Sequence, residues 1–150
     1  MLLRDQRAFH VMAKPIGPLC NLNCRYCFYL EKAKLYPAAS MWRMPDEVLE
    51  SYIRQYIQSQ DAPVVTFAWQ GGEPTLLDLA FFRRAVELQK QYADGRCFEN
   101  TLQTNGINLD DPWCQFLRKT IFSLDCPSTA QESCMTDIES TKGAAPPSTV

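Results

Sequence analysis

Three cysteines gather near the amino end of the sequence at a spacing that suits metal binding. Cys20, Cys24 and Cys27 are separated by three and by two residues, so one turn of backbone can direct their sulfurs to one point. Thiolates are soft ligands that suit zinc or an iron–sulfur cluster, and both centres usually take four protein ligands. The only histidine, His10, lies in an expected strand. The spacing predicts a metal centre with one open position, and a zinc-binding module stays as an alternative.

A second motif, Gly-Gly-Glu-Pro at residues 71–74, directly follows a run of β-branched and aromatic residues. Glycine lets a backbone approach a neighbour closely, and Glu73 can pair with an ammonium group through a charge-assisted hydrogen bond. Alone this motif is only a turn. After a strand of a β/α fold, it lies on the face where such folds bind ligands. The two motifs together predict a ligand site.

The other cysteines and the overall charge narrow the class of protein. Seven cysteines is an odd number, which does not fit a secreted disulfide framework. The net charge of −2 and the charged amino end predict a cytoplasmic protein that binds neither nucleic acid nor membrane. The scattered cysteines are interpreted as small apolar residues; they are Cys97, Cys114, Cys126 and Cys134.

Strand and helix patterns alternate along the chain and would position both motifs. This alternation predicts parallel βαβ units, about three and a half of them, in an α/β fold. Asp78 is expected to cap the second helix. The expected strands are 9–14, 64–69 (buried), 97–103 and 121–125, and the expected helices are 45–57, 78–92 and 111–119. The second helix is expected to be buried along Phe82, Ala85, Val86 and Gln89. The residues that repeat at helical spacing in the first helix are Val48, Leu49, Tyr52, Ile53, Tyr56 and Ile57.

The two motifs together resemble the radical S-adenosylmethionine (SAM) superfamily. Residues 14–32, 67–76 and 102–106 are similar to one subfamily, the anaerobic sulfatase-maturating enzymes. The resemblance covers roughly Lys14 to Lys119, with residues 123–125 as a last fragment. It implies that the sheet is part of a β/α barrel of the radical SAM type.

The resemblance also implies a reaction and a set of site residues. The three cysteines would hold a four-iron four-sulfur (4Fe-4S) cluster, and SAM would chelate its remaining iron. The resulting 5′-deoxyadenosyl radical would start oxidation of a sulfatase cysteine or serine to Cα-formylglycine, with an electron donor such as flavodoxin or ferredoxin. The catalytic residue stays unassigned. The residues implied to contact SAM are Tyr26, Gly71, Gly72, Glu73 and Ser123.

Several alternatives stay open. The structural alternatives are that Tyr26, Phe28 and Tyr29 simply pack the loop and that Ser123 is an ordinary strand residue. The functional alternatives are another peptide-modifying radical SAM enzyme and a non-catalytic metal-binding module.

The similarity decays after Lys119, which predicts two segments, 1–125 and 126–150. Residues 123–127 read Ser-Leu-Asp-Cys-Pro where the subfamily has Ser-Leu-Asp-Gly-Pro, and the following tail is rich in Ser, Thr, Pro and Ala, as in disordered segments. A one-base shift allows codons for Ser133 to Pro146 to encode His-Asp-x-Tyr-Arg and a Gly-Gly-Arg-Pro-like run, as the subfamily has. We therefore expect a frame break between Lys119 and Ser128, and a chain that turns over little or no substrate. The coding DNA tests it.

Overall fold

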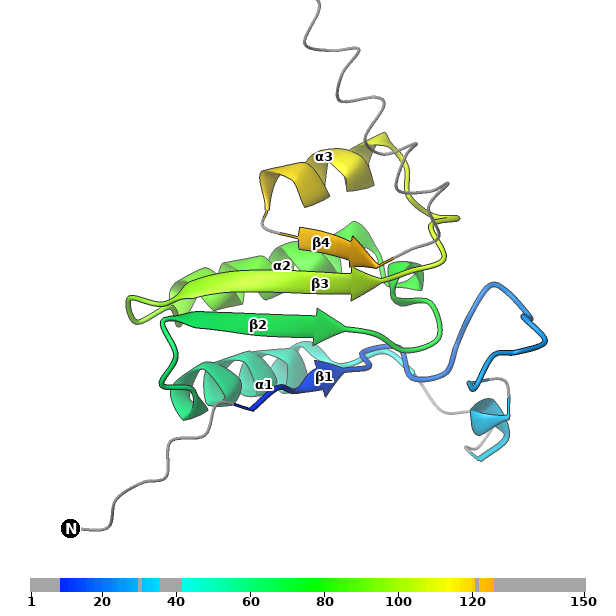
Figure 1. Cartoon of the computed structure of the whole chain (residues 1–150), viewed down its shortest axis with the longest axis horizontal. Coiled ribbons are helices and arrows are strands. Elements are labelled where there is room, and N and C mark those ends of the chain that lie inside the picture. The colour runs from blue at the N-terminus through cyan, green and yellow to red at the C-terminus, as the bar shows by residue number, and fades with distance from the viewer. Residues whose placement is uncertain (1–8, 30, 36–41, 121, 126–150) are drawn as a thin grey trace, which may run out of the picture.

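The computed structural model describes residues 9–29, 31–35, 42–120 and 122–125, and within these the expected alternation of strand and helix is present (Figure 1). Two short 3-10 helices, η1 (Lys32–Leu35) and η2 (Pro74–Leu76), lie in the connections. The strands are β1 (Met12–Ala13), β2 (Val64–Trp69), β3 (Cys97–Gln103) and β4 (Phe122–Asp125), and the α-helices are α1 (Asp46–Ser59), α2 (Leu79–Gln91) and α3 (Asp111–Lys119).

The described strands form one sheet in the order β1-β2-β3-β4, and every neighbouring pair is parallel. In the register, Trp69 lies beside Leu102 and Thr101 lies beside Ser123. The predicted parallel α/β fold is confirmed. Because the strands are parallel, their carboxyl ends meet at one edge, on the right in Figure 1, and the segment that carries the three cysteines lies at that edge.

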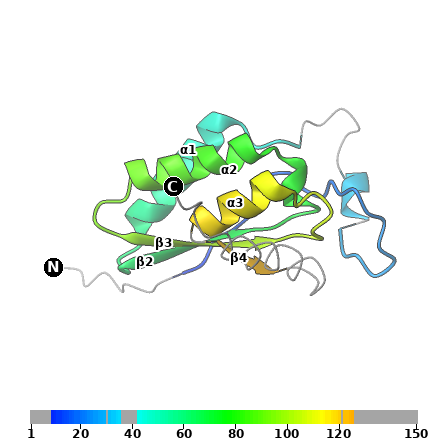
Figure 2. The same ribbon diagram turned by 90° about the horizontal axis from the view of Figure 1, so that it is seen from above.

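The helices α1, α2 and α3 all lie on one face of the sheet (Figure 2). Val65, Phe67 and Trp69 of β2 are buried beneath them, whereas Val64 is 42% exposed and the residues between are only partly buried. The prediction of a buried β2 therefore holds for one face only, because no described helix covers the other.

The helical repeat of α1 and the expected buried positions of α2 are largely confirmed, with three exceptions. Leu49, Ile53 and Ile57 of α1 have no exposed surface. Val48 is 49% exposed, and Tyr52 and Val86 are only half-buried.

Side-chain caps fix the start of two helices. Asp78 Oδ1 accepts a hydrogen bond from the backbone N–H of Phe81 at 3.1 Å, and Asp110 Oδ1 accepts one from Trp113 at 3.0 Å. Such caps satisfy backbone donors that have no partner within the helix. The predicted cap at Asp78 is confirmed, and α2 follows it directly.

A buried polar network joins α2 to the sheet. Asn100 Oδ1 accepts hydrogen bonds from Trp69 Nε1 at 2.9 Å and from Gln89 Nε2 at 2.8 Å. Asn100 Nδ2 in turn donates to Gln89 Oε1 at 3.0 Å. All three side chains are at most 4% exposed, so each polar group takes its partner from another element of the fold.

The first strand is shorter than expected, since only residues 12–13 pair with β2 instead of 9–14. Side chains take the hydrogen bonds that a longer strand would make. Tyr56 Oη donates to the carbonyl of Phe9 at 3.2 Å, and Gln60 Nε2 donates to the same oxygen at 3.0 Å. The backbone N–H of Val11 donates to Tyr56 Oη at 3.4 Å.

No helix in the described ranges combines the length and the apolar character that a membrane span requires. The segment 126–150, with Cys126, Cys134 and the end of the expected frame-break region, lies outside the described residues.

Candidate functional site

The segment that follows β1, residues 14–29, is here named the cysteine loop, and it is hydrogen-bonded to the Gly-Gly-Glu turn. The backbone N–H of Gly72 donates to the carbonyl of Gly17 at 2.8 Å, and that of Glu73 donates to Leu19 at 2.7 Å. Next to these bonds, where β1 and β2 end, the backbone N–H of Gln70 donates to the carbonyl of Ala13 at 2.8 Å. The structure therefore brings the two motifs together at the carboxyl edge of the sheet.

Both glycines of the turn are required by the cysteine loop itself. A Cβ atom on Gly72 would lie 1.9 Å from the carbonyl oxygen of Leu19. Gly71 has φ of +136°, and a Cβ there would lie 2.8 Å from the carbonyl oxygen of Gly17. Sequence reasoning expected these glycines to admit a ligand. In the structure, the group that lies close to both glycines is the backbone of the cysteine loop. Contact of these glycines with SAM stays a prediction.

Glu73 is 1% exposed, and its carboxylate accepts four hydrogen bonds. Oε1 accepts from the backbone and hydroxyl of Thr75, at 3.0 and 2.7 Å, and from Thr104 Oγ1 at 2.7 Å. Oε2 accepts from the backbone N–H of Asn105 at 2.6 Å. An ionised carboxylate has about four lone-pair sites, and Oε2 uses one of its two. Glu73 thus joins the ends of β2 and β3.

The three cysteines of the loop are free thiols, and each is partly buried. The backbone N–H of Cys27 donates to Cys24 O at 2.9 Å, which closes a turn between them, and Leu22 N donates to Cys20 Sγ at 3.4 Å. Within the described ranges, no three His, Cys, Asp or Glu side chains lie close enough together to hold a metal ion. Ligation by these cysteines stays a prediction.

The donor chemistry of the loop fits an iron–sulfur cluster. Three unpaired thiols lie in one loop at the ligand-binding edge of the sheet, and thiolates are the usual ligands of such clusters. Metal binding also supplies free energy that arranges its ligands. The residues present therefore suit the cluster in type and number.

The aromatic residues of the loop differ in their environments. Tyr26 is 92% exposed, so the alternative that its ring packs within the loop does not hold. Phe28 and Tyr29 do contact each other, with ring centres 5.7 Å apart. Lys32 Nζ lies 4.8 Å from the centre of the Phe28 ring, and Lys14 Nζ lies 5.0 Å from that of Tyr29.

The remaining predicted residues lie at different places in the fold. Ser123 is on β4, in register with Thr101. Cys97 is exposed at the amino end of β3, at the edge of the sheet opposite the cysteine loop. Cys114 is half-buried on α3, and His10 is exposed beside β1.

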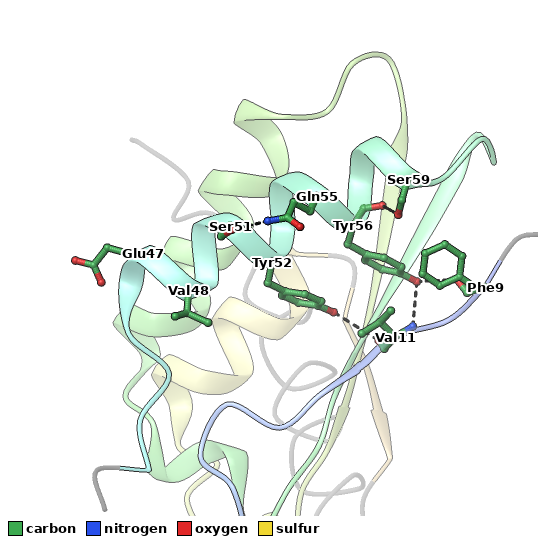
Figure 3. Close-up of a pocket in the computed structure, with 9 residues that line it drawn as sticks. All are labelled: Phe9, Val11, Glu47, Val48, Ser51, Tyr52, Gln55, Tyr56 and Ser59. Atoms are coloured by element: carbon green, nitrogen blue, oxygen red, sulfur yellow. Dashed lines mark hydrogen bonds between the residues drawn. The ribbon is translucent and has the colours of Figure 1, made fainter.

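A groove of about 700 Å³ runs along α1 and the segment that precedes β1 (Figure 3). Its two tyrosines stack with ring centres 5.8 Å apart. Tyr52 Oη donates to Val11 O at 3.5 Å, and burial raises the pKa of Tyr52 well above its usual range. The hydroxyls of Tyr52 and Tyr56 therefore hold the backbone of the segment before β1 against α1. The lining residues of the groove are Phe9, Val11, Glu47, Val48, Ser51, Tyr52, Gln55, Tyr56 and Ser59.

Comparison with known proteins agrees with this arrangement. The sequence profile of the Radical SAM superfamily matches residues 15–132. The chain is 50% identical over 113 residues to a serine-type anaerobic sulfatase-maturating enzyme of Bacteroides thetaiotaomicron, covering 75% of this chain and 27% of that enzyme. It is 40% identical over 123 residues to a cysteine-type anaerobic sulfatase-maturating enzyme of Clostridium perfringens, covering 78% and 33%.

Solved structures share the fold. Native anSMEcpe with bound AdoMet and Cp18Cys peptide superposes with a TM-score of 0.68 at 32% identity, over 86% of this chain and 39% of that chain. Native anSMEcpe with bound AdoMet gives a TM-score of 0.65 at 38% identity, over 74% and 29%.

A parallel α/β fold with the cysteine loop bonded to a Gly-Gly-Glu turn, together with the profile match, defines the class: the chain belongs to the radical SAM superfamily. It spans between about a quarter and a third of the length of the curated relatives it matches.

Proposed function

We propose that this chain forms the part of an anaerobic sulfatase-maturating enzyme that binds a 4Fe-4S cluster and SAM. One observation carries the proposal: the backbone of the Gly-Gly-Glu turn is hydrogen-bonded to the loop that holds three free thiols. Relatives named as sulfatase-maturating enzymes share up to 50% identity with the chain. The zinc-module alternative lacks comparable support, because the matching structures contain AdoMet.

In this proposal Cys20, Cys24 and Cys27 are the cluster ligands. When bound, the reduced cluster and SAM supply one-electron cleavage of the sulfonium bond, which starts hydrogen abstraction from the substrate. The backbone N–H groups of Gly72 and Glu73 hold the cysteine loop at the edge of the sheet.

The groups proposed to meet SAM differ in how freely the fold presents them. Tyr26 is exposed and available to the adenine. Glu73 offers the remaining acceptor site of Oε2 to the SAM ammonium, beside the hydrogen bond from Asn105. Ser123 lies on β4, so the proposed SAM site extends across the sheet from the cysteine loop.

We also propose that the sheet is the first part of a β/α barrel. Parallel sheets are normally covered on both faces, but α1, α2 and α3 cover only one (Figure 2). The opposite face is polar or small in character, since Thr66, Ala68, Glu99 and Thr101 alternate with the buried residues of β2 and β3. A face of this kind suits the interior of a barrel that binds a polar cofactor and a peptide.

The substrate in this proposal is a sulfatase polypeptide, whose cysteine or serine is oxidised to Cα-formylglycine. Relatives of both the serine and the cysteine type match the chain, and one matching structure contains the Cp18Cys peptide. The electron donor would be a ferredoxin or flavodoxin. Free thiols in the cysteine loop suit a reducing compartment, and the cytoplasm is the location we propose.

Binding of SAM to the loaded chain tests the proposed function. The chain is reconstituted with iron and sulfide without oxygen and reduced, and its electron paramagnetic resonance spectrum is recorded with and without SAM. Chelation of the open iron should change the g-values of the cluster, whereas S-adenosylhomocysteine, which lacks the sulfonium charge, should change them less. A fully loaded protein whose spectrum is identical with and without SAM would contradict the proposal.

A further inference from the structure

Asn105, in the turn after β3, contacts the cysteine loop through its side-chain amide. Its Nδ2 atom lies 2.8 Å from Asn21 Oδ1 and 3.8 Å from Cys20 Sγ. Both acceptors lie more than 80 positions earlier in the sequence. The end of β3 thereby reaches the first cysteine of the loop.

The orientation of this amide is fixed by its other atoms. Asn105 Oδ1 accepts a hydrogen bond from the backbone N–H of Ile107 at 3.1 Å, so the NH₂ group must face the cysteine loop. The backbone N–H of Asn105 donates to Glu73 Oε2 at 2.6 Å, and the neighbouring Thr104 hydroxyl donates to Oε1 at 2.7 Å. The backbone of Asn105 is thus held by Glu73 and its side-chain oxygen by Ile107, and these contacts are independent of Cys20.

We propose that Asn105 is a positioning residue for Cys20, which it holds against the Gly-Gly-Glu turn and whose sulfur it supplies with a hydrogen bond. The inference rests on the proposed function, since it concerns Cys20 as a cluster ligand. Residues that donate hydrogen bonds to metal ligands orient those ligands and adjust the properties of the metal centre. Hydrogen bonds to the sulfurs of an iron–sulfur cluster help to set its reduction potential. Such a donor stabilises the extra negative charge of the reduced cluster.

Loss of this donor should make the cluster harder to reduce. Cys20 Sγ would keep the hydrogen bond from Leu22 N, so the effect is partial. We expect about a tenfold loss in the reduction equilibrium, which corresponds to a midpoint potential about 59 mV lower for a one-electron couple.

The substitution Asn105→Ser removes the donor with little other change. A serine hydroxyl can still accept from the N–H two residues later, as in turns of this kind, but it is shorter and carries no amide. Asn108→Ser is the matched control, because Asn108 lies in the same connection and makes no hydrogen bond within the described part of the chain. Asn105→Asp is a second variant that keeps the acceptor for Ile107 and removes the donor.

The experiment uses the full chain, loaded with iron and sulfide without oxygen, and measures iron content, unfolding free energy and midpoint potential. We expect both Asn105 variants to have a lower potential than wild type, with Asn105→Asp the lowest because of its added charge, and Asn108→Ser to match wild type. Loss of cluster from the Asn105 variants at unchanged stability would also support the proposal.

Two results would overturn the inference: loaded Asn105 variants with the potential of wild type, or failure of both to fold where Asn108→Ser folds. If wild type itself takes up no cluster, it is the proposed function that fails, and the two failures are distinguishable.

Discussion

At the scale of single residues, the site depends on glycines, whose lack of a Cβ atom lets two backbone segments approach each other. Gly72 has no Cβ, and this allows its backbone N–H to meet Gly17 O at 2.8 Å while its Cα faces the carbonyl of Leu19. Two chain segments that are about fifty positions apart can therefore run side by side. The type of residue at position 72 decides where the cysteine loop lies.

Gly72→Ala should destabilise the chain because the new Cβ would lie 1.9 Å from a backbone oxygen that cannot move alone. We expect a loss of about 3 kcal/mol in the free energy of unfolding, at the upper end of overpacking effects, measured by urea denaturation.

Gly95→Ala is the control for this prediction. Gly95 has φ of +78°, but a Cβ there would meet nothing within 4 Å, so only backbone strain of about 1 kcal/mol is expected. Equal losses in the two variants would show that the clash with the cysteine loop does not form.

Residue types predicted the motifs of the site but not their contacts. The cysteine spacing and the Gly-Gly-Glu turn are visible in the sequence, and so is the run that ends at Asn105. The contact between Asn105 and Cys20 depends on the register of β2 with β3 and on the hydrogen bonds of Glu73. Neither follows from local spacing, which is why sequence reasoning left Asn105 without a role.

At the scale of elements, the start of α2 depends on a charged cap. The backbone N–H of Phe81, together with the Arg43 guanidinium, lowers the pKa of Asp78 below its ordinary value. A lowered pKa in the folded state means that the ionised form stabilises the fold. This contribution is complete above the unfolded-state pKa of about 3.9 and is lost as pH falls through the lower folded-state value.

The substitution Asp78→Asn keeps the cap acceptor and removes the charge. At pH 7 wild type should be more stable by about 0.5 kcal/mol, as expected for a largely exposed charge at a helix amino end, and the difference should vanish as pH falls below 4. Unfolding in urea between pH 2.5 and pH 7 measures it.

Asp61→Asn is the control, since Asp61 is exposed and makes no side-chain hydrogen bond or ion pair with the described residues. Its stability should follow wild type at every pH. A pH dependence in Asp78→Asn that equals that of wild type would contradict the role of the charge.

The network around Asn100 joins α2 to two strands. Asn100→Ala would leave the buried Trp69 Nε1–H and the Gln89 amide without their partner, and each unsatisfied buried group is costly. We expect a loss of about 3 kcal/mol in unfolding free energy, measured by urea denaturation.

Asn108→Ala provides the comparison, because Asn108 is half-buried and should lose only about 0.5 kcal/mol. A loss of similar size at position 100 would mean that water replaces the missing partner.

Most elements were predictable because their patterns are local. The expected strands 64–69 and 97–103 and the expected helix 111–119 have the bounds found in the structure. The strand 9–14 was predicted too long because its competitors, the Tyr56 hydroxyl and the Gln60 amide, lie more than forty positions away. Local strand propensity does not reveal that a distant side chain takes the backbone hydrogen bonds that a neighbouring strand would otherwise make.

At the scale of the whole molecule, the three described helices lie on one face of the sheet, and no described helix covers the other, which is polar or small in character (Figure 2). The cysteine loop extends beyond the carboxyl edge of the same sheet (Figure 1). Tyr26 and Phe28 of the loop are 92% and 70% exposed. A cofactor bound at this edge would contact loop, turn and strand ends together, which is the geometry that the proposed function requires.

The central claim is that three thiolates of one loop bind an iron–sulfur cluster, and iron counting tests it most directly. Wild type, Cys24→Ala and Cys97→Ala are loaded with iron and sulfide without oxygen, desalted, and assayed for bound iron, sulfide and visible absorption. We expect about four irons per chain, as in a cubane cluster, in wild type and Cys97→Ala. Cys24→Ala should bind far less. Equal iron in both cysteine variants, or a colourless wild type, would contradict the account.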